Sequence, residues 1–134
     1  MSRLTIFLAR FIGLSAVILV AGLVVKGTAI IQTATADVPV MFIFAVLSLA
    51  AGLAMILGHN VWKGGVLTVV VTVVGWLIFA KGLMLLFLKP DAFAGLIQGM
   101  QVAEHPYVTL APAFVIGLYL TVAGFTARTP PREL

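Results

Sequence analysis

The chain has no cysteine and few charged residues, and these two shortages exclude several classes of protein. Without cysteine there can be no disulfide, no thiolate zinc site and no cysteine-ligated iron–sulfur cluster. Charged residues make up 9% of the 134 residues, against about 25% in soluble domains. Hydrophobic residues make up 63%. Because a small soluble domain leaves much of its surface in water, we expect most of these apolar side chains to face lipid.

Acidic residues are scarcer still, since four Asp and Glu accompany eight Lys and Arg and leave a net charge of +4. The basic residues are scattered singly, whereas a nucleic-acid surface needs a clustered basic stripe. We therefore expect no nucleic-acid partner. Single basic residues beside apolar runs are typical of membrane proteins. They predict the lipid bilayer as a partner, together with the chain itself or other membrane proteins.

Four apolar runs are long enough to cross a bilayer. A transmembrane helix needs about 20 residues for a hydrocarbon core about 30 Å thick. The predicted spans cover residues 4–25, 39–57, 66–88 and 107–127. Turn or charge signals separate them at Lys26-Gly27, Gly58-His59-Asn60 and Lys89-Pro90-Asp91. We predict an all-α four-helix transmembrane bundle that occupies residues 1–134 as one domain.

The first run also has features of a signal peptide, because Arg3 and Arg10 lie at its start and Ala34-Thr35-Ala36 follows it. A signal peptide places its cleavage site soon after the apolar stretch. Here the apolar stretch ends near Val25, well upstream of Ala36. We therefore expect residues 4–25 to be a membrane span.

The basic residues also predict the orientation, since Lys and Arg near the helix ends favour the cytoplasm. With four spans, both termini and the middle loop share one side. That side has five basic residues: Arg3, Arg10, Lys63, Arg128 and Arg132. The other side has three, namely Lys26, Lys81 and Lys89. We predict a multi-pass protein with both termini in the cytoplasm.

The longest connection lies between the third and fourth spans. Asp91, just after Pro90, is a candidate helix cap. An apolar stripe at helical spacing follows, formed by Phe93, Leu96, Ile97 and Met100. We predict a short interfacial helix over about residues 91–103, on the outer membrane surface before the fourth span. The alternative is a loop tucked onto the bundle.

Glycine and proline recur in the two halves of the chain. The first and third spans each contain two glycines, Gly13 and Gly22 in one and Gly75 and Gly82 in the other. The second and fourth each follow a proline and reach a Gly-Leu pair, at Pro39 and Gly52-Leu53 and at Pro106 and Gly117-Leu118. Two-helix repeats in parallel would produce this pattern. Because the spacings differ, chance similarity among apolar segments is the favoured interpretation.

Lys81 lies about two turns inside the third span, where a charge is costly and needs a reason. One interpretation places it in the bundle interior, paired with an acid or contacting an anion. The other is snorkelling, in which the stem lies in lipid and the ammonium reaches the outer headgroups. We favour snorkelling, because the end of the span at Leu88 is about 10 Å away along the helix.

His59 and Asn60 lie at the cytoplasmic end of the second span. A histidine there could handle protons or bind a ligand. The favoured interpretation is an interfacial turn that begins where Gly58 ends the helix. The predicted interfacial anchors are Trp62 and Lys63 in this turn and Arg10 on the first span.

A second group of polar residues lies on the outer side. Glu104 and His105 precede the fourth span, and a small polar site at the outer mouth of the bundle would combine them with Asp37, Asp91 and Lys81. The favoured interpretation is that these side chains simply face water. His59 and His105 lie on opposite sides, so this topology does not let them share one metal or haem.

No catalytic constellation is present in the sequence: there are no paired carboxylates on one helix and no glycine-rich phosphate loop. No set of His, Asp and Glu has metal-ligand spacing, so we expect no metal, no cofactor and no enzymatic activity. Small residues do recur at helix-packing spacing, which predicts close helix contacts. The pairs are Ala9 and Gly13, Ala50 and Ala54, and Ala113 and Gly117.

The middle of the chain resembles a family of small bacterial four-span membrane proteins without an assigned activity. The resemblance rests on an HNxW turn followed by GW and KG pairs, in the segments 57–62, 72–76 and 81–82. Lys63-Gly64-Gly65 departs from it, since relatives are expected to have an acidic or aromatic residue there. The resemblance implies a location in the bacterial inner membrane. It also implies that five residues matter to the family: His59, Asn60, Trp62, Trp76 and Lys81.

Together these features favour a non-enzymatic accessory or structural subunit, packed in a homo-oligomer or in a larger membrane complex. The alternative is a small oligomeric transporter or channel with Lys81 in a polar cavity. A lipid-modifying enzyme ranks third, because only the His59 turn or the Glu104-His105 pair could supply its polar groups.

Overall fold

The computed structural model describes residues 1–27, 29–101, 104–128 and 131, and all regular structure in these ranges is helical. Four long helices are each long and apolar enough to cross a membrane. They are α1 (Arg3–Lys26), α3 (Val38–Gly58), α4 (Val66–Phe87) and α6 (Pro106–Thr126). Their bounds lie within one residue of the predicted spans. The prediction of an all-α four-helix bundle is therefore confirmed.

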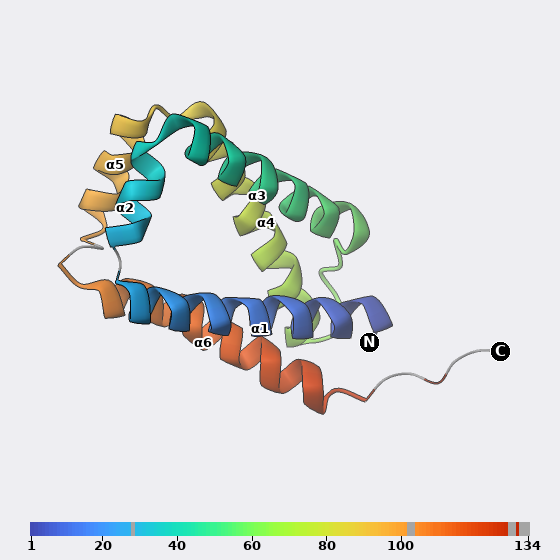
Figure 1. The fold of residues 1–134 in the computed structure, drawn as a ribbon. Coiled ribbons are helices and arrows are strands. Elements are labelled where there is room, and N and C mark those ends of the chain that lie inside the picture. Colours follow the sequence, from blue (N-terminus) through green and yellow to red (C-terminus); the bar gives the residue numbers. More distant parts are fainter. Residues whose placement is uncertain (28, 102–103, 129–130, 132–134) are drawn as a thin grey trace.

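Two short helices, α2 (Ala29–Ala36) and α5 (Pro90–Gly99), join the long ones. Both lie at one end of the bundle, whereas the start of α1, the α3–α4 loop and the end of α6 lie at the other (Figure 1). We call the end with α2 and α5 the outer end and the opposite end the inner end.

The long helices form two antiparallel pairs, α1 with α6 and α3 with α4. Glycines bring the backbones of α3 and α4 together. A Cβ on Gly52 would lie 2.5 Å from the backbone nitrogen of Phe79, and one on Gly82 would lie 2.7 Å from that of Leu49. In lipid the hydrophobic effect does not hold helices together, so such close backbone contact is a main source of their attraction.

Glycines join α1 and α6 in the same way. A Cβ on Gly13 would lie 2.5 Å from the backbone nitrogen of Thr121, and one on Gly117 would lie 2.8 Å from the Cβ of Ala16. The predicted close contact at Ala9 and Gly13 is therefore made, and α6 supplies the facing surface.

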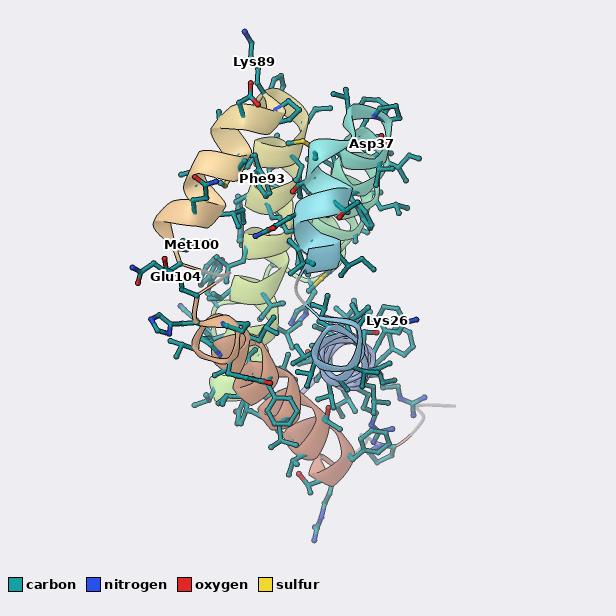
Figure 2. All side chains as sticks on the ribbon, turned by 60° about the vertical axis from the view of Figure 1, so that its left-hand side comes forward. Lys26, Asp37, Lys89, Phe93, Met100 and Glu104 are labelled. Atoms are coloured by element: carbon teal, nitrogen blue, oxygen red, sulfur yellow. The ribbon has the colours of Figure 1, made fainter. Side chains whose placement is uncertain are left out.

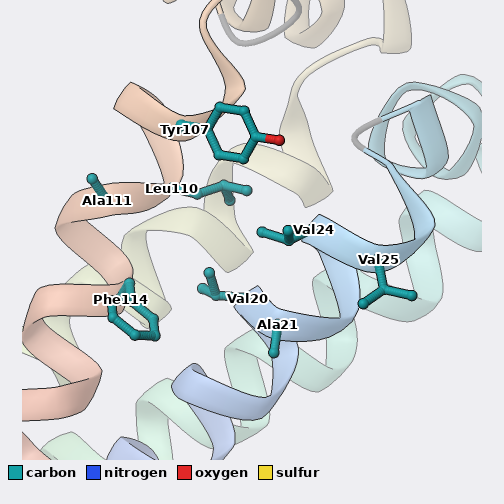
Figure 3. Close-up of a pocket in the computed structure, with 8 residues that line it drawn as sticks. All are labelled: Val20, Ala21, Val24, Val25, Tyr107, Leu110, Ala111 and Phe114. Carbon is teal, nitrogen blue, oxygen red and sulfur yellow. The ribbon is translucent and has the colours of Figure 1, made fainter.

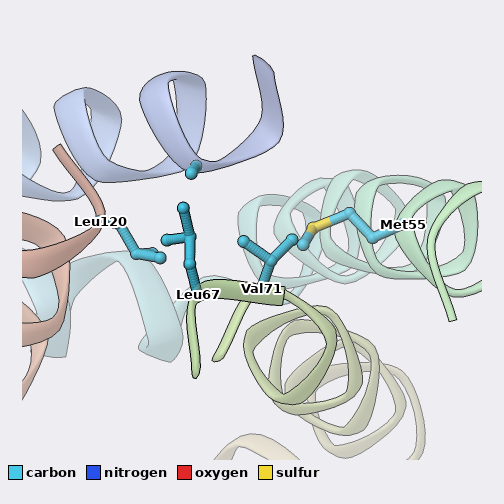
Figure 4. Packing of buried hydrophobic residues seen from close by; sticks show 5 residues of the cluster. Met55, Leu67, Val71 and Leu120 are labelled. Carbon is cyan, nitrogen blue, oxygen red and sulfur yellow. The ribbon is translucent and has the colours of Figure 1, made fainter. Parts of the chain in front are cut away.

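The two pairs meet through one buried cluster. Val71 and Leu67 of α4 contact Met55 of α3, Ala9 of α1 and Leu120 of α6. Figure 4 shows Leu67 and Leu120 pointing toward each other and Val71 lying beside Met55. This cluster is what joins the α1–α6 pair to the first half of α4.

The predicted interfacial helix is present as α5, and it also packs onto the bundle. Phe93 is buried against Met41 and Leu85, and Ile97 packs beside this cluster. The predicted end at Ala103 lies outside the described residues. The predicted cap was wrong: Lys89 is the N-cap and Asp91 lies in the first turn. Pro90 takes the first helical position because its fixed φ suits that place.

The sequence did not predict α2, which has eight residues. None of them is buried within the chain. The hydroxyls of Thr33 and Thr35 donate to the carbonyl oxygens of Ala29 and Ile31 within it. Asp37 then starts α3, since its carboxylate accepts a hydrogen bond from the amide of Val40 at 3.1 Å.

The order of elements repeats, because both halves of the chain read long helix, short helix, long helix. In this order α1 corresponds to α4, α2 to α5 and α3 to α6. The α1–α6 pair therefore corresponds to the α4–α3 pair, and the two short helices, α2 and α5, contact each other. The glycine recurrence noted in the sequence thus coincides with a repeated arrangement. This favours the interpretation of two parallel repeats over chance similarity.

Candidate functional site

The α3–α4 loop folds back along α4, and Thr72 holds it there. The Thr72 hydroxyl donates to the carbonyl oxygen of Val61 at 2.8 Å and accepts from the amide of Val61 at 3.3 Å. Thr72 lies six residues after Val66, or about 9 Å into α4. Non-helical backbone at such depth needs protein partners for its polar groups, and Thr72 supplies them.

Asn60 connects the two tryptophans of the chain. Its Oδ1 accepts a hydrogen bond from Nε1 of Trp62 at 2.8 Å and a longer one from Nε1 of Trp76 at 3.5 Å. Both indoles are about half exposed. Trp76 is in the middle of α4, and the folded-back loop brings Asn60 to it. The structure thus joins the HNxW turn to the GW pair.

His59 is the most buried residue of this turn, with 3% of its surface exposed. Its amide donates to the carbonyl oxygen of Met55 and caps α3. Among the described residues, its Nε2 is the buried side-chain nitrogen or oxygen that has no hydrogen-bond partner. A buried group without a partner is costly, so this imidazole is the least satisfied polar group of the turn.

The turn itself is made by Lys63-Gly64-Gly65. Gly64 and Gly65 have φ angles of 106° and 118°, which side chains with a Cβ rarely adopt. The segment that departs from the family resemblance is therefore the one that reverses the chain. Lys63 and Trp62, which the sequence predicted as interfacial anchors, are exposed at the inner end.

Lys81 is exposed on the outside of α4. Its neighbour Gly82 packs against Leu49 of α3. This orientation agrees with snorkelling toward the outer headgroups. It places Lys81 away from the bundle interior. The KG pair therefore combines one outward residue with one packing residue.

The polar residues of the outer end are spread apart. Asp37, Asp91, Glu104 and His105 are all exposed. Asp37 caps α3, and Figure 2 shows it across the outer end from Glu104, with Lys89 at a third position. The structure does not gather them into one site. Within the described part of the chain, no group of three or more His, Asp and Glu is placed to hold a metal ion.

Arg10 packs against the end of α6. Its Nε donates to the carbonyl oxygen of Gly124 at 2.8 Å, and its guanidinium lies 4.9 Å from the centre of the Phe125 ring. A cation near a helix C-terminus is favourable because carbonyl groups point toward it. The predicted anchor thus also joins α1 to α6.

A groove of about 580 Å³ lies between the two helix pairs toward the inner end. We call it the inner groove. One wall is the α1 face from Leu4 to Leu19, and Ile78 of α4 also lines the groove. The other wall is α3, through Ala51, Ala54, Met55 and Gly58.

A second groove, of about 400 Å³, lies between α1 and α6 toward the outer end. In Figure 3, Val20 and Val24 of α1 lie across it from Phe114 and Leu110 of α6. The α3–α4 pair has Gly82 against Leu49 toward the same end.

Sequence reasoning missed Thr72 and both grooves. Thr72 had a weak signal, because a threonine inside a span usually bonds a carbonyl of its own helix. The grooves had none, since they depend on which helices pair. Comparison of the chain with protein-family models, curated proteins and solved structures gives no match.

Proposed function

We propose that this protein is a non-enzymatic accessory or structural subunit that packs in a homo-oligomer or a larger membrane complex. The observation that carries this proposal is the shallow burial of its spans. Between 17% and 28% of the most apolar window of each span is buried within the chain. Most of each helix is therefore left to contact lipid or another membrane protein.

The way the two helix pairs are joined supports the same proposal. Each pair is packed closely through glycines, but the pairs meet mainly through the single cluster around Val71. Large apolar side chains such as Phe42 and Phe87 are more than half exposed. A partner that contacts both pairs would stabilise their relative position.

Three polar side chains form hydrogen bonds that hold parts of the fold together, and this use of polar groups favours a structural role over a catalytic one. Thr72 bonds the α3–α4 loop, Asn60 bonds the two indoles, and Arg10 bonds the end of α6. We further propose that the protein resides in a bacterial inner membrane with both termini in the cytoplasm. The family resemblance supports the first part and the distribution of basic residues the second.

The assembly proposal is tested by gentle extraction from native membranes. We expect the protein to migrate as a homo-oligomer or with another membrane protein, and cross-linking before extraction to give the same species. A monomer in both measurements would overturn the proposal. The transporter alternative gains no support from Lys81, which lies outside both grooves.

A further inference from the structure

We propose that the inner groove binds one acyl chain of an anionic phospholipid from the inner leaflet, with its phosphate held by the basic residues of the inner end. This inference does not depend on the assembly proposed above. It rests on the lining of the groove, its length and the charges at its mouth.

The lining suits a hydrocarbon chain. Apart from Ser15, every residue that lines the inner groove is apolar or glycine. A volume of about 580 Å³ is within the range of small-molecule pockets, roughly 300–1,000 Å³. The side chains on the α3 wall are short, because most of its residues are small: Ala51, Ala54 and Gly58.

The length of the groove distinguishes a lipid from a partner helix. The α3 wall from Ala51 to Gly58 is about 10 Å long, and the α1 wall from Leu4 to Leu19 is about 22 Å long. A membrane-spanning helix would pack across a core of about 30 Å, whereas one leaflet occupies about half of that thickness. The two walls lie on either side of the half-thickness of about 15 Å and both fall short of the full core, and the groove begins at the inner end.

The charges at the mouth of the groove complement a phosphate. Arg3 directly precedes Leu4, and Lys63 is in the loop that follows Gly58. The two walls meet here, since a Cβ on Gly58 would lie 3.9 Å from Cδ2 of Leu4. The carboxylates of Asp37, Asp91 and Glu104 lie at the outer end, away from this mouth.

The first experiment fills the groove. The purified protein is exchanged into mixed micelles with equal amounts of phosphatidylglycerol and phosphatidylcholine, and retained lipid is counted by native mass spectrometry. We expect the parent protein to retain one phosphatidylglycerol and Ala54→Phe to lose it. Ala50→Phe is the matched control, because Ala50 is exposed on the same helix outside the groove. Ala51→Leu serves as a second, smaller block should Ala54→Phe fail to fold.

The second experiment tests the headgroup. A basic residue near an anionic lipid surface contributes an attraction equivalent to about fivefold in affinity. We therefore expect Arg3→Gln and Lys63→Gln each to lower the preference for phosphatidylglycerol over phosphatidylcholine about fivefold. Lys89→Gln, at the outer end, should leave that preference unchanged.

Three outcomes would overturn the proposal. Equal retention of the two lipids by the parent protein would remove the role of the charges. Equal lipid retention by Ala54→Phe and Ala50→Phe would place the lipid elsewhere. Loss of an oligomer in Ala54→Phe, with lipid retention unchanged, would assign the groove to a second copy of the chain. Cross-linking in the same samples separates this result from a failure of the assembly proposal.

Discussion

Thr72 and Val61 form a reciprocal pair, in which one hydroxyl satisfies both the carbonyl oxygen and the amide of one loop residue, at 2.8 Å and 3.3 Å. Thr72 is 2% exposed, so little water can replace it. The pair explains how a non-helical loop runs beside α4 without leaving its backbone groups unbonded.

Replacing Thr72 with Val should destabilise the α3–α4 hairpin, because valine has nearly the same shape but no hydroxyl. Leaving the Val61 groups unbonded should lower the free energy of unfolding by about 1–3 kcal/mol. Thermal unfolding in detergent measures this. Thr72→Ser keeps the hydroxyl and should stay closer to the parent protein. Equal stability of all three proteins would show that the loop does not need this bond.

Glycine substitutions should separate contact positions from open ones. Gly52→Ala and Gly13→Ala would place a methyl group 2.5 Å from backbone nitrogens of the facing helices, and overpacking of this kind costs about 1–3 kcal/mol. Nothing lies within 4 Å of a Cβ on Gly22. Gly22→Ala should therefore be neutral or slightly stabilising, because alanine favours helices. A common unfolding temperature for the three variants would contradict the observed helix pairing.

Arg10→Met should weaken the α1–α6 pair, because it keeps the length of the side chain but removes the bond to Gly124 and the contact with Phe125. The expected loss is about 2 kcal/mol in the free energy of unfolding. Arg128 is an exposed arginine near the end of α6, and Arg128→Met serves as the control. Comparable effects of the two changes would assign Arg10 to general interfacial anchoring.

Lys81→Met should change the unfolding free energy by less than about 0.5 kcal/mol, as expected of an exposed position. The same variant reconstituted in liposomes should show the same ion flux as the parent protein. A marked loss of stability or of flux would indicate that Lys81 has a partner or pathway beyond the single chain.

Labelling of single cysteines should reveal the orientation, and the absence of cysteine in the chain removes any background. Lys63 and Lys89 are both exposed, at the inner and outer ends. In intact cells, an impermeant maleimide should label Lys89→Cys and should label Lys63→Cys only after the membrane is opened. The reverse pattern would place both termini outside the cytoplasm.

The limits of sequence-based prediction are clearest in the α3–α4 hairpin. The sequence marked His59, Asn60, Trp62 and Trp76 through a resemblance, and the interfacial turn was predicted from Gly58. The bond between Asn60 and Trp76 joins a loop to the middle of a helix. No local spacing rule predicts it, because it depends on the loop folding back.

The sequence alone determined the number of spans, their bounds and the apolar stripe of α5, because a bilayer demands long apolar runs and penalises charge within them. Only the tertiary structure decided that α1 pairs with α6 and α3 with α4, which glycines meet, and where the two grooves lie. The physical reason is that lipid is as apolar as the helix interfaces. Spans that are apolar all round do not encode in their hydrophobic pattern which face turns toward another helix.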